Sequence, residues 1–132
     1  MTINVPDVGE NLILEALVNK TSPQDLVLKL FQNDVTPSDT DTAATYTEAT
    51  FSGYAALTLT GATWGAASGG SIAYPMQTFT SDAAQTLQNI YGYYMVQATS
   101  GKLVLAERFT NGPYAVTNQG DKIDLTPTIT AS

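Results

Sequence analysis

The sequence predicts a mainly β protein, an antiparallel β-sandwich or jelly roll with one short helix near its N-terminus. Its 132 residues are 43% hydrophobic and only 13% charged, and threonine, a β-branched residue suited to the outer face of a sheet, is abundant. Apolar and polar residues alternate through much of the chain after residue 25, and turn signals recur closely in the second half. We therefore expect residues 1–132 to form a single β-domain.

The N-terminal segment is expected to differ from the rest of the domain. Residues 1–6 alternate in polarity, which indicates an arm or a short strand able to pair with a neighbouring edge. A helix is predicted over residues 8–19, because Asp7 and Glu10 resemble a capping box and the residues that follow have helical periodicity. A strand is the alternative, since residues 12, 14, 16 and 18 are all apolar. The apolar stripe of the helix consists of Ile13, Leu14, Leu17 and Val18.

Residues 26–130 are predicted to form the β-rich body. A half-buried strand is expected at 26–32, followed by a long polar surface loop over 34–51. Two β-prone runs, 90–98 and 103–109, predict an antiparallel hairpin that turns at residues 100–101. Further strands are expected within 53–64 and 72–81 and at 114–117 and 122–130, with Pro75 and Pro127 at edges or bulges.

The chain contains no histidine and no cysteine. These absences exclude Ser/His/Asp and Cys/His catalysis, and zinc sites built from those ligands. Two carboxylate pairs, Asp39 with Asp41 and Asp121 with Asp124, are the candidates left for acid–base chemistry, but both lie in or beside turns, which aspartate commonly initiates. We therefore predict a protein that is not an enzyme, with no catalytic residues and no cofactor.

Three acidic residues of the long loop form a weak candidate set for calcium. Asp39, Asp41 and Glu48 could offer the several oxygen ligands that this hard cation requires. Their spacing differs from that of the twelve-residue calcium loop and lacks its glycine. An acidic exposed loop is the favoured interpretation, so no metal site is predicted.

The charge balance narrows the classes of partner. Five Lys plus Arg against twelve Asp plus Glu give a net charge of -7, which opposes binding to phosphates or anionic lipid. Neither a nucleic acid nor a membrane partner is expected. No apolar stretch approaches the roughly 18 residues of a membrane span, and the N-terminus lacks the plan of a secretion signal. We expect a soluble protein made in the cytoplasm.

Seven residues are candidates for an interface with another protein. Glu107 and Arg108 are adjacent on a strand and so point to opposite faces, which places at least one charge on a face that is otherwise apolar. A strand-end pair near solvent is the favoured interpretation of these two charges, and contact with a partner subunit is the other. The strand before the turn is rich in tyrosine, a residue concentrated at interfaces. Strand alternation predicts Tyr91 and Tyr93 on one face and Tyr94 on the other, and we expect one of these faces to be partly exposed. The candidates are Ile3, Val5, Tyr91, Tyr93, Tyr94, Glu107 and Arg108.

Much of the chain resembles a known family. The segments "TYTEATFSGYAALTLTGATW", "IYGYYMVQATSGKLVLAERF", "NGPYAVTNQGDKIDLTPTIT" and "VLKLFQNDVTPSDTDTAATYTEA" are similar to small virion structural proteins of tailed bacteriophages. The resemblance implies a head decoration or capsid cement protein, made in the host cytoplasm and present in many copies on the capsid surface of the virion. It also implies binding to the major capsid protein and a homo-oligomer, a trimer or a dimer.

The expected function is therefore that of a non-enzymatic structural protein that binds the outside of a phage head and bridges shell subunits. One alternative is a tail or fibre component that recognises the host through loops carrying Tyr46, Trp64 and Tyr74. The other is a carbohydrate-binding or carbohydrate-processing β-domain, because sandwich folds host sugar sites and two carboxylates suffice for glycoside hydrolysis.

Overall fold

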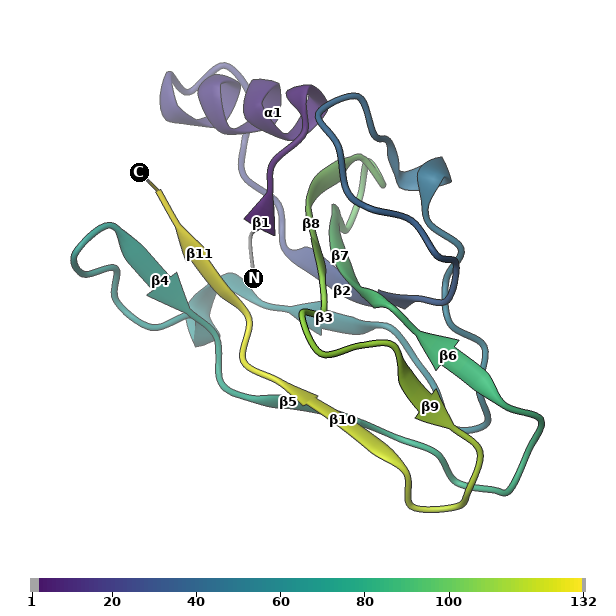
Figure 1. Ribbon diagram of the computed structural model, residues 1–132. Helices are drawn as coiled ribbons and strands as arrows, with labels where there is room; N and C mark the ends of the chain where they lie inside the picture. The colour runs from purple at the N-terminus through teal and green to yellow at the C-terminus, as the bar shows by residue number, and fades with distance from the viewer. Residues whose placement is uncertain (1–2, 132) are drawn as a thin grey trace.

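The computed structural model describes residues 3–131, and its architecture is mainly β, antiparallel and sandwich-like, with one helix near the N-terminus, as the sequence predicts (Figure 1). The helix is α1 (Asp7–Leu17), and two single 3-10 turns lie at Ala43–Thr45 and Gly61–Thr63. The strands are β1 (Ile3–Asn4), β2 (Leu26–Phe31), β3 (Leu57–Leu59), β4 (Ser71–Ala73), β5 (Gln77–Thr80), β6 (Gln88–Ile90), β7 (Gly92–Gln97), β8 (Leu103–Arg108), β9 (Tyr114–Val116), β10 (Lys122–Leu125) and β11 (Thr128–Thr130).

A five-stranded antiparallel sheet in the order β1-β8-β7-β2-β3 forms one layer of the sandwich. Its centre is the predicted hairpin of β7 and β8, which turns at Gly101 with a positive φ of 70° that favours glycine. The predicted first run is broken at Tyr91, because β6 leaves the hairpin and pairs with β9 instead. Gly92 starts β7 where a Cβ would lie 2.1 Å from the backbone oxygen of Glu107, so only glycine fits this approach.

The second layer is dominated by a long two-stranded ribbon in which β4 pairs with β11 and β5 pairs with β10. Pro75 and Pro127 interrupt the two sides of the ribbon, so the single strand expected over residues 122–130 is divided into β10 and β11, since proline cannot donate a ladder hydrogen bond. The two sides stay joined there, because the Tyr74 backbone N–H donates to the Pro127 carbonyl at 2.8 Å. Figure 1 shows the ribbon running from β4 and β11 to β5 and β10 along one side of the molecule.

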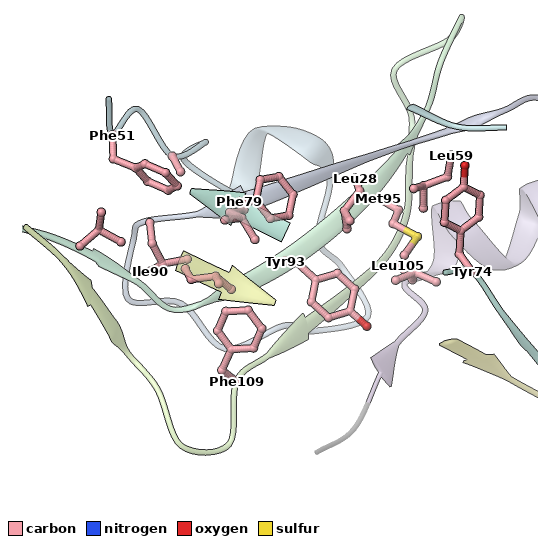
Figure 2. Packing of buried hydrophobic residues seen from close by; sticks show 14 of the residues in the cluster. Leu28, Phe51, Leu59, Tyr74, Phe79, Ile90, Tyr93, Met95, Leu105 and Phe109 are labelled. Carbon is pink, nitrogen blue, oxygen red and sulfur yellow. The ribbon is translucent and has the colours of Figure 1, made fainter. Parts of the chain in front are cut away.

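The main hydrophobic core lies between these two layers (Figure 2). Leu28 and Met95 of the sheet are completely buried, and they belong to one cluster with Phe79 and Ile123 of the ribbon. The face of β2 that the alternation of apolar residues predicts to be buried does face the core, with Leu28 and Leu30 completely buried. Contact between the inner faces of two sheets is the arrangement that defines a sandwich.

A second, smaller cluster covers the opposite face of the five-stranded sheet. The 34–51 segment has no regular strand, as predicted, but it returns over the sheet and buries Tyr46, whose ring stacks on Tyr94 with centroids 5.0 Å apart. Both faces of β7 are consequently buried. The expectation that one tyrosine face of this strand would be partly exposed is wrong, because a covering loop cannot be inferred from the alternation of the strand itself.

The predicted helix is confirmed, with two corrections. It begins at Asp7 and ends at Leu17, and Pro6 precedes it as N-cap without a side-chain cap, so the predicted capping box does not form. The first turn contacts the sheet at Gly9, where a Cβ would lie 2.1 Å from the backbone oxygen of Val104. Because this contact sets which side of the helix faces the sheet, the apolar stripe points to solvent. Its members, Ile13, Leu14, Leu17 and Val18, are all exposed.

Candidate functional site

A groove opens where the two layers of the sandwich separate at the β1 edge of the five-stranded sheet. Its volume is about 870 Å³. One wall is made by β1, β7 and β8, the other by β10 and β11, and the 109–114 connection closes one end. In Figure 1, β1 and the free side of β11 lie next to each other across this opening. The groove thus joins the first residues described in the chain to the last ones.

The sheet wall carries a buried carboxylate. Ile3, Glu107 and Tyr93 are opposite one another on three neighbouring strands, so their side chains share one face of the sheet. Glu107 is only 4% exposed, and its Oε2 accepts a hydrogen bond of 2.9 Å from the Tyr93 hydroxyl. No ion pair within residues 3–131 includes Glu107. This carboxylate therefore reaches the groove with one neutral donor as its partner.

Tyr93 is held in its protonated form. Burial raises the pKa of its hydroxyl, and the negative charge and hydrogen bond of Glu107 raise it further. A hydroxyl that keeps its proton can only donate to the carboxylate and brings no positive charge. Figure 2 shows the hydroxyl of Tyr93 at the margin of the apolar cluster, pointing away from the Leu28 and Phe79 side chains. The Tyr93–Glu107 pair thus marks the border between core and groove.

The opposite wall of the groove is polar and nearly neutral. Lys122 Nζ lies 3.8 Å from Asp124 Oδ2, and the Thr78 hydroxyl donates to Asp124 Oδ1 at 2.6 Å. The cation of this wall is therefore already beside a carboxylate of its own strand. At the closed end, the rings of Phe109 and Tyr114 are in contact, with centroids 5.0 Å apart. The remaining lining residues are Thr110, Asn111, Thr126, Thr128 and Thr130, together with the apolar Ile123 and Leu125.

Arg108 lies on the other face of the sheet, as the strand alternation predicts. Its Nη1 is 2.6 Å from Asp34 Oδ1, and its guanidinium lies 5.1 Å from the centre of the Tyr91 ring. Tyr91 packs with the smaller cluster around Tyr94, so it does not share a face with Tyr93, contrary to the sequence-based expectation. The register changes because the chain passes from β6 to β7 at this residue.

The N-terminal candidates are used within the chain. Ile3 pairs with Glu107 and Asn4 with Ala106, so the first residues form a short strand on the edge of the sheet, one of the two predicted possibilities. Ile3 and Val5 pack against the main core. This strand leaves its own outer edge beside the groove.

The three residues considered for calcium have separate partners. Asp39 accepts a hydrogen bond from Asn4, and Glu48 lies 3.3 Å from Lys29 Nζ and accepts a bond from Tyr54. Asp41 accepts bonds from Ser38 and Tyr46; partial burial opposes ionisation, but these bonds outweigh it and lower the pKa of Asp41. Within residues 3–131 no three acidic side chains gather closely enough to hold a metal ion.

The second carboxylate pair has structural partners as well. Asp121 accepts hydrogen bonds of 2.9 Å from the backbone N–H groups of Thr117 and Asn118, and these bonds lower its pKa. Asp124 bonds to Thr78 and lies beside Lys122. Each aspartate thus fixes a turn or a strand pair.

The loop aromatics considered for host recognition are not the exposed contacts that this alternative requires. Tyr46 and Tyr74 are buried, and Trp64 is half-buried with its ring 5.2 Å from that of Tyr74. The expectation that these aromatic rings are exposed is wrong, because they lie outside the regular strands but pack against the two hydrophobic clusters.

The exposed apolar stripe of α1 is a second candidate binding surface, in addition to the groove. Ile13 and Leu14 are about half exposed, and Leu17 and Val18 are 77% and 72% exposed. A shallow hollow lies beside it between the helix and the sheet, lined by Leu12, Ala16 and Pro23 among others. Four large apolar side chains on one helical face form a contiguous patch of the kind that marks contact sites.

Comparisons with known proteins add no family to these observations. No family model matches the chain, and a comparison with curated proteins also finds no match. Within residues 3–131, no helix has both the length and the apolar character needed to cross a membrane.

Sequence reasoning identified Glu107 and Tyr93 but missed most of the groove. The signal for Glu107 was a charge on an apolar face. The ribbon wall had no comparable signal, since Thr128 and Lys122 are ordinary strand residues that become groove residues only when β10 and β11 come to lie opposite β1.

Proposed function

We propose that this protein is a non-enzymatic virion structural protein, a decoration or cement protein that binds the outside of a tailed-phage head. In this role it bridges subunits of the major capsid protein and acts as a homo-oligomer, a trimer or a dimer. The observation that carries the proposal is the exposed apolar stripe of α1, formed by Ile13, Leu14, Leu17 and Val18.

The stripe supports a binding role because it costs free energy while it faces water. Full burial of a leucine or valine side chain contributes about 1.5–3 kcal/mol, so covering this face with another protein surface would contribute several times that amount. The helix contacts the sheet at Gly9 and packs on the core through Leu12, whereas the stripe residues remain exposed and accessible to a partner. A protein that coats a shell in many copies requires such a surface on every copy.

The arrangement of the carboxylates supports a role without catalysis. The aspartates of both candidate acid–base pairs make hydrogen bonds or ion pairs that hold loops and strands, and Glu107 is bonded to a tyrosine that keeps its proton. A general acid or base must be free to exchange its proton with a substrate. The net charge of -7 supports a protein partner in preference to nucleic acid or an anionic membrane.

The test combines particle composition with a disrupted stripe. Quantitative mass spectrometry of purified particles of a phage that encodes this chain measures its copies relative to the major shell protein. We expect a simple ratio to the shell subunits. The double variant Leu14→Glu with Leu17→Glu should lower particle occupancy at least tenfold, because each change places a charge in an apolar contact.

The matched control carries the same added charge outside the stripe. Asn11→Glu with Thr21→Glu changes two exposed polar residues and should keep wild-type occupancy. A handful of copies per particle would move the protein to the tail. Absence from particles would overturn the proposal, and normal occupancy of the stripe variant would overturn the role given to α1.

A further inference from the structure

We propose that the groove beside β1 is the docking site for an extended segment of a partner protein, and that a lysine or arginine of this segment pairs with Glu107. The inference deepens the proposed function, on whose assignment of a protein-binding role it rests, by naming the chemistry of the partner. It concerns a surface separate from the stripe of α1.

The walls of the groove favour an extended peptide. Within residues 3–131, β1 pairs only with β8, β10 only with β5, and β11 only with β4. Each of these strands therefore keeps one edge whose backbone N–H and C=O groups have no strand partner, and residues of all three line the groove. An open edge of this kind accepts a further strand by backbone hydrogen bonding, while side-chain pockets select the sequence.

The floor of the groove favours a cation. Glu107 is nearly buried, and its hydrogen-bond partner is the neutral Tyr93 hydroxyl. A buried carboxylate without a countercharge is costly, and a cation that arrives with a ligand removes that cost. The basic residues of this region are otherwise engaged, since Arg108 lies on the opposite face with Asp34 and Lys122 lies beside Asp124.

The charge of the groove has the same sign as that of the whole chain. Its charged side chains are Glu107, Asp124 and Lys122, two acids and one base. The chain as a whole carries -7. Complementary charge steers a basic segment toward such a surface and disfavours an acidic one. The length of the groove along β10 and β11, with threonine hydroxyls on its wall, suits a strand with alternating polar side chains.

The test uses two synthetic peptides and the purified full chain. Both probes have seven residues, blocked ends and alternating threonine and valine, and they differ only at the centre, which is lysine in one and norleucine in the other. Titrations followed by NMR give the affinity and the position of each probe. We expect the lysine peptide to bind at least about tenfold more tightly, a ratio typical of close charge pairs. Amide shifts should centre on Ile3, Glu107 and Thr128.

The variant Glu107→Gln completes the comparison. Glutamine preserves the shape of the side chain and can still accept the Tyr93 hydrogen bond, so the affinity ratio of the two peptides should fall to near one. The wild-type ratio remains decisive even if this variant does not fold. Equal affinities on the wild-type protein, no binding of either probe at millimolar concentration, or shifts centred outside the groove would each overturn the inference.

These outcomes are distinct from those of the particle experiment. If particles carry the protein in a simple ratio while the peptides fail to bind, the groove inference falls and the capsid role stands. If the lysine peptide binds through Glu107 while particles lack the protein, the capsid proposal is overturned and the proposal of a peptide-binding groove stands.

Discussion

Helix α1 and the β7–β8 hairpin are both rich in apolar residues, but they are buried to opposite extents. In β7 and β8 all residues except the last of each strand are buried. In α1 only Gly9 is fully buried, while the residues of the apolar stripe face solvent. An apolar pattern thus identifies an element and its periodicity, but the elements packed around it decide whether the pattern becomes core or surface.

The physical reason for the difference is the number of layers on each element. The hairpin lies between the ribbon on one side and the 34–51 segment on the other, so both of its faces are covered. The helix has the sheet on one side and no second layer over its stripe within residues 3–131. Burial on both faces favours folding of the hairpin, whereas the stripe of the helix is left for intermolecular contact.

The largest expected effect separates the two regions by stability. Met95→Ala should lower the free energy of unfolding by about 2–5 kcal/mol, because it removes a completely buried side chain and leaves a cavity. Leu17→Ala, at a position 77% exposed, should change it by about 0.5 kcal/mol or less. Urea unfolding of both variants measures the difference. Equal losses would show that the helix stripe is covered in solution, for example in an oligomer.

A smaller effect is expected where the two regions meet. Gly9→Ala places a methyl group against the Val104 backbone oxygen, so the helix must move away from β8 at a cost of about 1–3 kcal/mol. The control Asn11→Ala, at an exposed position of the same helix, should stabilise by a few tenths of a kcal/mol through helix propensity. Comparing the thermal unfolding of the two variants separates the cost of the lost helix–sheet contact from the effect of helix propensity. A neutral Gly9→Ala would mean that the helix is not held at this point.

The smallest expected effect concerns the tyrosines of the hairpin, and it appears only at alkaline pH. Burial, with a smaller contribution from the negative charge of Glu48, raises the pKa of Tyr94 to about 12, and burial also raises the pKa of Tyr93. An unfolded tyrosine loses its proton near pH 10, whereas the folded protein keeps it, so this stability is complete below about pH 10 and falls above it.

The measurement is unfolding temperature against pH, together with the absorbance of tyrosinate. Tyr94→Phe cannot ionise, so it should have a shallower alkaline decrease and near-normal stability at pH 7, because no hydrogen bond of the Tyr94 hydroxyl is present among residues 3–131. An unchanged alkaline slope in this variant would show that Tyr94 is accessible to solvent.

Local patterns predicted the elements well and their surroundings less well. The hairpin turn at Gly101, the helix near the N-terminus and the breaks at Pro75 and Pro127 follow from residues within a few positions of each feature. The cover over Tyr94 and the outward orientation of Leu17 depend on partners far along the chain. Periodicity contains no information about such partners. The predicted exposure of one tyrosine face was therefore wrong, and the orientation of Leu17 could not be predicted.

In the candidate site, too, one part could be predicted from local sequence and the other only from tertiary packing. A charge on an apolar strand was enough to single out Glu107, because a buried carboxylate always requires a partner. The groove around it brings Ile3 together with Thr128, residues at opposite ends of the chain, and only the packing of the ribbon against the sheet creates this proximity. The sequence by itself determined a β-rich acidic chain without histidine or cysteine chemistry, since composition and periodicity act locally. Tertiary structure alone decided which edges stay open, because that depends on how the two layers separate.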